Sequence, residues 1–98
     1  MNLETGIFKL VRTGSDLTCR QLAILFACRY EPRTVRKLAQ LLAVSRPAIS
    51  RAIDRLAYCG YAERQDDPSD RRSVLIVLTD AGRRFVSAFD TEMYRKAS

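Results

Sequence analysis

The chain of 98 residues contains no histidine, few cysteines and no long apolar run. Histidine is the side chain used most often as a general base, so its absence argues against an enzyme. A metal site is not expected, because histidine is missing and Cys19, Cys28 and Cys59 are far apart in the sequence. No cofactor is expected either. The longest apolar run, 22–28, is much shorter than the ~20 residues that cross a membrane.

The three cysteines form an odd count without paired spacing, which indicates reduced thiols. Cys19 begins a predicted helix beside Arg20, so a redox-sensing role is conceivable. Cys28 is expected to be buried, and a structural or incidental role is the preferred interpretation for all three thiols. Glu4 interrupts the position where the apolar core of a signal peptide would begin, so a cytoplasmic location is expected.

The charge is unbalanced in favour of cations. Lysine and arginine total 17 residues against 11 aspartates and glutamates, which gives a formal charge of +6. Such a surplus favours a polyanion as partner, although many basic proteins are merely soluble. Arginine supplies 14 of the 17 cations, and its planar fork suits phosphates and guanine edges. A length of 98 residues predicts one domain, 1–98, with one core.

Apolar spacing and capping residues predict five helices and a hairpin. The first helix, about 2–12, carries an apolar stripe made of Leu3, Ile7, Leu10 and Val11. Capping residues Thr18, Thr34 and Ser45 begin helices at about 19–30, at 35–42, and from 46 to an end at 59–60, where Gly60 is expected to be a left-handed cap. Apolar residues are expected to point inward from the third helix (Leu38, Leu41, Leu42) and from the fourth (Ile49, Ala52, Ile53, Leu56). Strands at 61–65 and 73–78 flank a turn-rich loop at 66–72, and Thr79 caps a last helix. The order ααααββα is mainly α with a small β-hairpin (α+β), a winged helix-turn-helix.

The segment 34–56 has the pattern of a helix-turn-helix, whose second helix enters a major groove of DNA. Its first turns would lie deepest, so the candidates for base contact are Arg46, Pro47, Ser50 and Arg51. Arg55, one turn further on, is expected to meet phosphate. Thr34 and Ser45 cap helices whose amino ends can also hold phosphates. The alternative is an ordinary helical domain with solvated surface arginines.

The predicted wing carries Asp70, Arg71 and Arg72. Adjacent strand residues point to opposite sides, so one arginine can reach a minor groove while the other braces the loop against an aspartate. We expect Arg71 to reach DNA and Arg72 to pair with Asp66, Asp67 or Asp70, although the sequence does not decide between the two arginines. The alternative is a plain hairpin with an exposed ion pair.

Four segments together resemble the MarR family of bacterial transcription regulators: 45–56, 60–64, the Asp-Pro-Ser-Asp-Arg-Arg run at 67–72, and the Leu-Thr-Asp-Ala-Gly-Arg run at 78–83. The resemblance extends from about Leu17 to Phe89. It implies a homodimer on a pseudo-palindromic operator in double-stranded DNA, usually acting as a repressor on the bacterial nucleoid. It also implies a recognition helix in the major groove and a wing arginine in the minor groove.

One departure from the family concerns the ends of the chain, since family members usually have longer first and last helices that interlock in the dimer. The segments 1–14 and 80–98 are the candidate dimerisation helices, through Leu3, Ile7, Leu10, Val11, Phe85, Val86, Phe89 and Met93. A homodimer is the preferred interpretation, but the same stripes can simply close the core of one subunit. A different function stays open: a protein-interaction module or antagonist that pairs with another regulator or the transcription machinery.

Overall fold

The computed structural model describes residues 4, 8 and 17–97, and for 89–97 it describes the backbone alone. Of the predicted first helix, Glu4 and Phe8 are described and are helical, whereas its apolar stripe lies outside the described residues: Leu3, Ile7, Leu10 and Val11. The remaining elements are α2 (Cys19–Ala27), β1 (Arg33–Thr34), α3 (Val35–Leu42), α4 (Arg46–Tyr58), β2 (Ala62–Asp67), β3 (Asp70–Leu78) and α5 (Asp80–Ala97). Helices and hairpin therefore follow in the predicted order, and the predicted winged helix-turn-helix architecture is confirmed over this part of the chain.

Each of three predicted N-caps is confirmed by a hydrogen bond. The hydroxyl of Thr18 accepts the N–H of Gln21 at 3.1 Å, that of Thr34 accepts the N–H of Lys37 at 3.0 Å, and Ser45 accepts from Ala48 at 3.3 Å. These hydroxyls satisfy backbone donors that have no partner within a helix. Gly60 follows α4 with φ +82°, the left-handed conformation expected of it.

Helix α2 is shorter than the predicted range of 19–30. The carbonyl oxygen of Ala27 accepts a hydrogen bond at 2.9 Å from Nε of Arg33, a residue of β1. The Arg33 guanidinium also lies 3.1 Å from a carboxylate oxygen of Glu31. A side chain from the next element thus takes the place of a helical partner at this carbonyl. The chain can therefore leave the helix at Ala27 and enter the sheet.

The sheet has the strand order β1-β3-β2 and is antiparallel throughout. Strand β1 was not predicted, since it has two residues, Arg33 and Thr34, paired with Ile76 and Leu75. The loop predicted at 66–72 is wrong, because β2 extends to Asp67 and β3 begins at Asp70. Backbone hydrogen bonds extend the hairpin into a segment of charged residues, which in the sequence alone resembles a loop.

The core lies where three helices meet the central strand. Its fully buried side chains are Ile24, Leu25, Leu38, Ile49, Ile53, Leu56 and Ile76. The stripe of α4 faces inward as predicted, but Leu41 of α3 is 50% exposed, so its predicted inward orientation is wrong. Leu38 is buried and Leu42, one turn later, packs against the core, whereas Leu41 lies at the solvent-exposed edge of this face.

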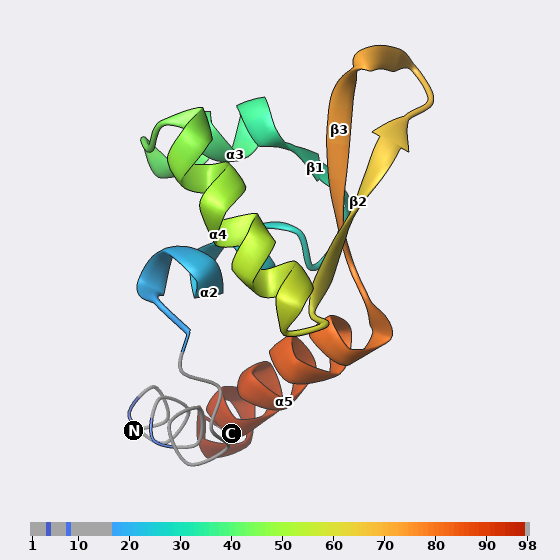
Figure 1. Cartoon of the computed structure of the whole chain (residues 1–98). Coiled ribbons are helices and arrows are strands. Elements are labelled where there is room, and N and C mark those ends of the chain that lie inside the picture. The colour runs from blue at the N-terminus through green and yellow to red at the C-terminus, as the bar shows by residue number, and fades with distance from the viewer. Residues whose placement is uncertain (1–3, 5–7, 9–16, 98) are drawn as a thin grey trace.

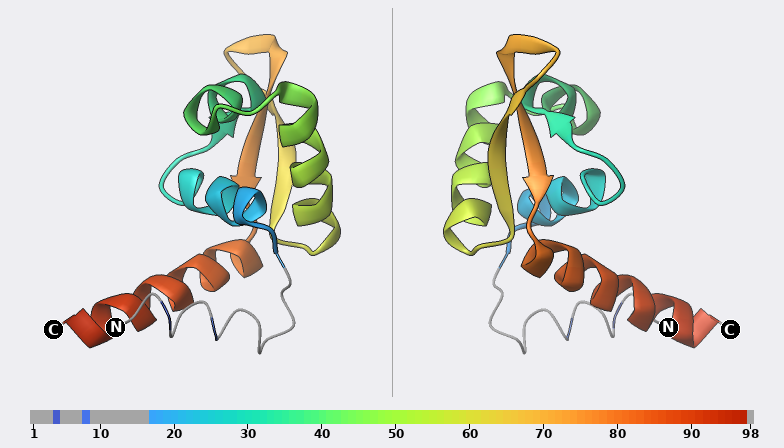
Figure 2. Two further views of the ribbon diagram at one scale, coloured as in Figure 1. Left: turned by 90° about the vertical axis from the view of Figure 1, so that its left-hand side faces the viewer. Right: turned by 90° about the vertical axis from the view of Figure 1, so that its right-hand side faces the viewer.

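The elements are arranged so that the two ends of the molecule differ. The hairpin projects beyond the helices at the end that also carries α3, while α5 crosses the opposite end and extends away from the domain (Figures 1 and 2). At the start of α5, the Thr79 hydroxyl donates to the carbonyl of Gly60 at 2.5 Å and accepts the N–H of Gly82 at 3.1 Å. This contact fixes α5 to the corner between α4 and β2. Among the described residues, no helix has both the length and the apolar character needed to cross a membrane.

Candidate nucleic-acid interface

Helix α4 has one buried and one exposed face. Ala48, Ile49, Ala52, Ile53 and Leu56 are buried, whereas the residues predicted to contact DNA are turned outward. Arg46, Pro47, Arg51 and Arg55 are exposed and Ser50 is half-buried. The inward stripe fixes the helix to the core, so the outward side chains share one face. The proline is accommodated in the first turn, where its missing N–H costs no helical hydrogen bond.

The wing tip consists of a hydrogen-bonded turn and a bulge on β3. Asp66 pairs with Val74, but the next residue, Asp67, pairs with Asp70, so Arg71, Arg72 and Ser73 form a bulge on β3. Pro68 and Ser69 form the turn, in which a carboxylate oxygen of Asp67 accepts the N–H of Ser69 at 2.9 Å and its hydroxyl at 2.7 Å. A bulge bends the strand and redirects its side chains. Both arginines are exposed on it.

Asp70 holds the bulge through the backbone. Its Oδ1 accepts the N–H of Arg72 at 2.9 Å and its Oδ2 accepts the Ser73 hydroxyl at 3.0 Å. These two hydrogen bonds, with a contribution from the nearby positive charge of Arg36, lower the pKa of Asp70 below its ordinary value. The predicted brace between Arg72 and an aspartate is therefore made by the backbone N–H of Arg72, and not by its guanidinium.

The guanidinium groups of Arg71 and Arg72 form no ion pair within the described part of the chain. Both are left available for an anion outside the protein. Helix α3 lies against β3, and the positive charge of Arg36 in its first turn is the one that contributes to the lowered pKa of Asp70. Arg36 and its neighbour Lys37, both exposed beside the Thr34 cap, were not predicted as site residues. Their position in the first helical turn after that cap was the feature of the sequence that could have indicated them as site residues.

Two contacts on the outer side of α4 were also missed. Arg64 of β2 donates from Nη2 to the carbonyl of Ser50 at 3.2 Å, and the same nitrogen lies 2.8 Å from Oδ1 of Asp54. No local pattern could indicate them, because 14 residues separate Arg64 from Ser50. Arg55, expected to meet phosphate, lies with its guanidinium carbon 5.5 Å from the centre of the exposed Tyr58 ring.

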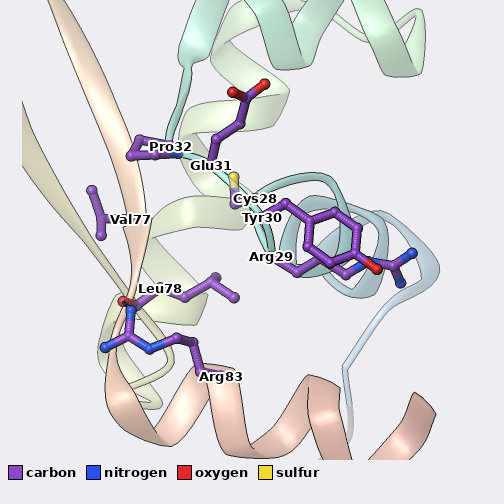
Figure 3. A pocket seen from close by; sticks show the side chains of 8 residues that line it. All are labelled: Cys28, Arg29, Tyr30, Glu31, Pro32, Val77, Leu78 and Arg83. Carbon is purple, nitrogen blue, oxygen red and sulfur yellow. Dashed lines mark hydrogen bonds between the residues drawn. The ribbon is translucent and has the colours of Figure 1, made fainter.

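A small pocket of about 180 Å³ lies at the junction of α2, β3 and α5 (Figure 3). Its lining comes from residues 28–32, Val77, Leu78 and Arg83. Arg83 donates to the carbonyl of Leu78 at 2.9 Å and pairs with Asp80, so its charge is already engaged. The volume is below the roughly 300 Å³ at which small-molecule sites usually begin. Within the described residues, no group of three or more His, Cys, Asp or Glu is placed to hold a metal ion.

The three cysteines are free, with Cys19 exposed, Cys59 half-buried and Cys28 buried as predicted. Burial raises the pKa of the Cys28 thiol to about 11, because the charged thiolate loses its hydration inside the core. The thiolate is the reactive form of cysteine. A buried thiol with a raised pKa is therefore a poor nucleophile at neutral pH.

We expect Cys28 to resist alkylation in the folded protein. At pH 8, a pKa of about 11 leaves about one thiolate per thousand molecules. Treatment with iodoacetamide followed by peptide mass spectrometry should show Cys19 labelled long before Cys28, and the difference should vanish in denaturant. Equal rates for both cysteines in the native protein would contradict the burial of Cys28.

The predicted dimerisation stripe of the last helix can be followed for two of its four residues. Val86 is 3% exposed and belongs to the core, and the ring centroids of Phe85 and Tyr61 are 4.9 Å apart. Val86 therefore helps to close the core of one subunit, which is the alternative that the sequence left open, and the half-buried Phe85 packs against that core. The side chains of Phe89 and Met93 lie outside the described residues.

A model of the MarR family matches residues 15–73, which span the helix-turn-helix and most of the wing. The chain belongs to the MarR family. The resemblance inferred from the sequence is thereby confirmed. Since members of this family are transcription regulators, the expectation that the chain is not an enzyme is confirmed as well.

Individual relatives agree with this assignment. The chain is 35% identical over 78 residues to the uncharacterised HTH-type transcriptional regulator YdcH of Bacillus subtilis, covering 74% of this chain and 53% of YdcH. It is 37% identical over 68 residues to the multiple antibiotic resistance protein MarR of Escherichia coli, covering 68% of this chain and 47% of that protein. The chain thus spans about half, or less, of the curated relatives that it matches.

Solved structures share the fold. The transcriptional regulator Tm0710 of Thermotoga maritima superposes with a TM-score of 0.82 at 26% identity, over 97% of this chain and 67% of Tm0710. A cysteine-to-serine variant of MarR from E. coli, complexed with operator DNA, superposes with a TM-score of 0.72 at 28% identity, over 86% of this chain and 64% of that one. The predicted winged-helix fold class is confirmed by both.

Proposed function

We propose that this MarR-family chain is a sequence-specific regulator of transcription that binds double-stranded DNA and acts as a repressor in the bacterial cytoplasm. The observation that carries the proposal is the placement of two arginine pairs. Arg46 and Arg51 lie on the outer face of α4, and Arg71 and Arg72 lie on the wing bulge, all four exposed. The operator complex of the E. coli relative supports the same use of this fold.

Each part of this surface has a proposed role. The first turns of α4 enter the major groove, where Arg46, Pro47, Ser50 and Arg51 reach base edges, and arginine can bind guanine through two hydrogen bonds. The wing lies over the adjacent minor groove, whose negative potential attracts Arg71. Phosphates are held by Arg55, by Arg72 and by the capped amino ends of α3 and α4 at Thr34 and Ser45. Asp70 contributes indirectly, because it fixes the shape of the bulge that carries the two arginines.

We propose that the chain acts as a homodimer on a pseudo-palindromic operator, with segments 1–14 and 80–98 as the dimerisation helices. The long projection of α5 away from the domain supports this arrangement (Figure 2). Two subunits would bind two half-sites about one helical turn apart.

The test is selection of binding sites from a random pool of duplex DNA at moderate salt. An enriched inverted repeat is the expected result. A single enriched half-site would contradict the homodimer but not DNA reading. Binding that depends on salt without any enrichment would contradict sequence-specific regulation and favour a protein-interaction module.

Replacement of Arg71 by alanine is expected to weaken binding to most duplexes alike and to lower the slope of log affinity against log salt by about 1. The reason is that an arginine in the minor groove responds to the negative potential of the groove and to its width more than it reads one base. Fluorescence anisotropy across a salt series measures the slope. Replacement of Arg20, an exposed arginine on α2, is the matched control and should leave the slope unchanged. An Arg71→Ala variant that loses affinity for the selected site alone would assign base reading to the wing instead.

A further inference from the structure

Arg64 occupies a position that joins the two elements expected to meet DNA. It lies in β2, one arm of the wing, and follows the buried Ala62 by two residues. Because strand side chains alternate, Arg64 is on the same side of the sheet as Ala62, which is the side that faces the core and α4. Figure 2 shows β2 running beside α4. The guanidinium therefore lies at the outer margin of the helix–strand contact.

One nitrogen of this guanidinium contacts two residues that are one turn apart on α4. Nη2 donates to the backbone carbonyl of Ser50 at 3.2 Å and lies 2.8 Å from Oδ1 of Asp54. Ser50 and Asp54 are four residues apart and so lie one above the other on the same face. The contact therefore fixes the backbone at one end of the turn and a side chain at the other.

The side chains on the buried side of α4 suggest why a contact on its outer side would matter. Two of its five buried residues are alanines, Ala48 and Ala52, whose small side chains interlock less deeply with the core than Ile49 and Ile53. Rotation of the helix about its own axis would move Ser50 and Arg51 sideways over an opposing surface. Binding constellations need their groups held within about 0.5 Å and 10–20°. Arg64 opposes this rotation from the outer side of the helix.

We propose that Arg64 is a positioning residue that fixes the rotation of α4 relative to the wing, and so sets the discrimination between DNA sequences. This assignment rests on the proposed DNA-binding function. Arg64 acts through Ser50 and Asp54 and needs no contact of its own with DNA. Since its side chain is 39% exposed and that of Asp54 is 67% exposed, the pair adds little to stability while it constrains geometry.

The test compares specificity with affinity. In Arg64→Lys the positive charge is kept, but a single ammonium cannot reproduce the planar guanidinium that holds carbonyl and carboxylate together. Asp54→Ala removes the partner and leaves the arginine. For each variant and the wild type, anisotropy gives the affinity for the selected site and for a scrambled duplex, and thermal unfolding gives Tm. Arg20→Lys serves as the matched control on another element.

Both variants should lose about tenfold in the ratio of selected-site to scrambled-site affinity, with scrambled-site affinity within about twofold of wild type and Tm within about 5 °C. The double variant should lose no more than either single variant, because both changes break the same contact. If Arg64 contacted a phosphate directly, Asp54→Ala would raise the affinity for DNA and would not lower it. Loss of the carboxylate would then free the arginine, raise affinity for both duplexes alike and leave their ratio unchanged, which would overturn the positioning role.

Two failures can be told apart. A wild type that discriminates between the duplexes, with both variants discriminating equally well, overturns the assignment of Arg64 alone. A wild type that binds both duplexes with the same affinity overturns the proposed function and this assignment together.

Discussion

Replacement of Arg51 by alanine is expected to weaken binding to the selected operator by about 1–3 kcal/mol, which is roughly 5- to 150-fold, and to relax base preference at one position of each half-site. Arg51 is exposed on α4, one residue after Ser50, and forms no ion pair with the described residues. Its guanidinium can therefore turn to a base edge without first leaving a partner in the protein. The Arg51→Ala substitution would then remove both hydrogen bonds of a bidentate contact with guanine.

The measurement is a repeat of site selection with the variant, followed by titration of duplexes changed at single positions. The wild type should lose affinity when the contacted base pair is changed, and Arg51→Ala should be indifferent to that change. Arg20→Ala, which removes the same charge from α2, should keep the full preference. Equal weakening on all duplexes would mean that Arg51 meets phosphate, and an unchanged preference would exclude it from the interface.

Replacement of Gly82 by alanine is expected to destabilise the domain by about 3 kcal/mol or more, even though alanine is the better helix former by about 1 kcal/mol. A Cβ at this position would lie 2.0 Å from the carbonyl oxygen of Tyr61 and 3.0 Å from its carbonyl carbon. Both are backbone atoms, so no side-chain rotation can relieve the overlap. The start of α5 would have to move away from the corner formed by Gly60 and Tyr61.

Chemical denaturation measures this loss, and Gly60→Ala is the informative comparison. Gly60 has φ +82°, and a Cβ added to it would meet no atom within 4 Å, so its substitution costs only backbone strain, about 1 kcal/mol. The first substitution should therefore cost several times more than the second. Gly82→Ala with wild-type stability would show that α5 can separate from the domain without loss, and the proposed platform for dimerisation would lose its rigid attachment.

The sequence by itself determined the elements whose causes are local. Thr18, Thr34 and Ser45 mark helix starts because a hydroxyl can cap the N–H groups only two or three residues away. The inward stripe of α4 follows from helical spacing, and Gly60 marks a left-handed residue because other side chains avoid that conformation. The arginines of α4 and the wing were found in the same way, since each belongs to a short motif.

Only the tertiary structure decided the features that depend on distant partners. Strand β1 exists because Arg33 and Thr34 meet Ile76 and Leu75, and two residues carry no periodicity of their own. The hairpin extends through charged residues since its backbone pairs regardless of side chain, and the bulge at 71–73 follows from that register. The contact of Arg64 with Ser50 and the enclosure of Val86 likewise arise from segments that only the fold brings together. A sequence read along its length records side-chain types, whereas these features depend on positions in space.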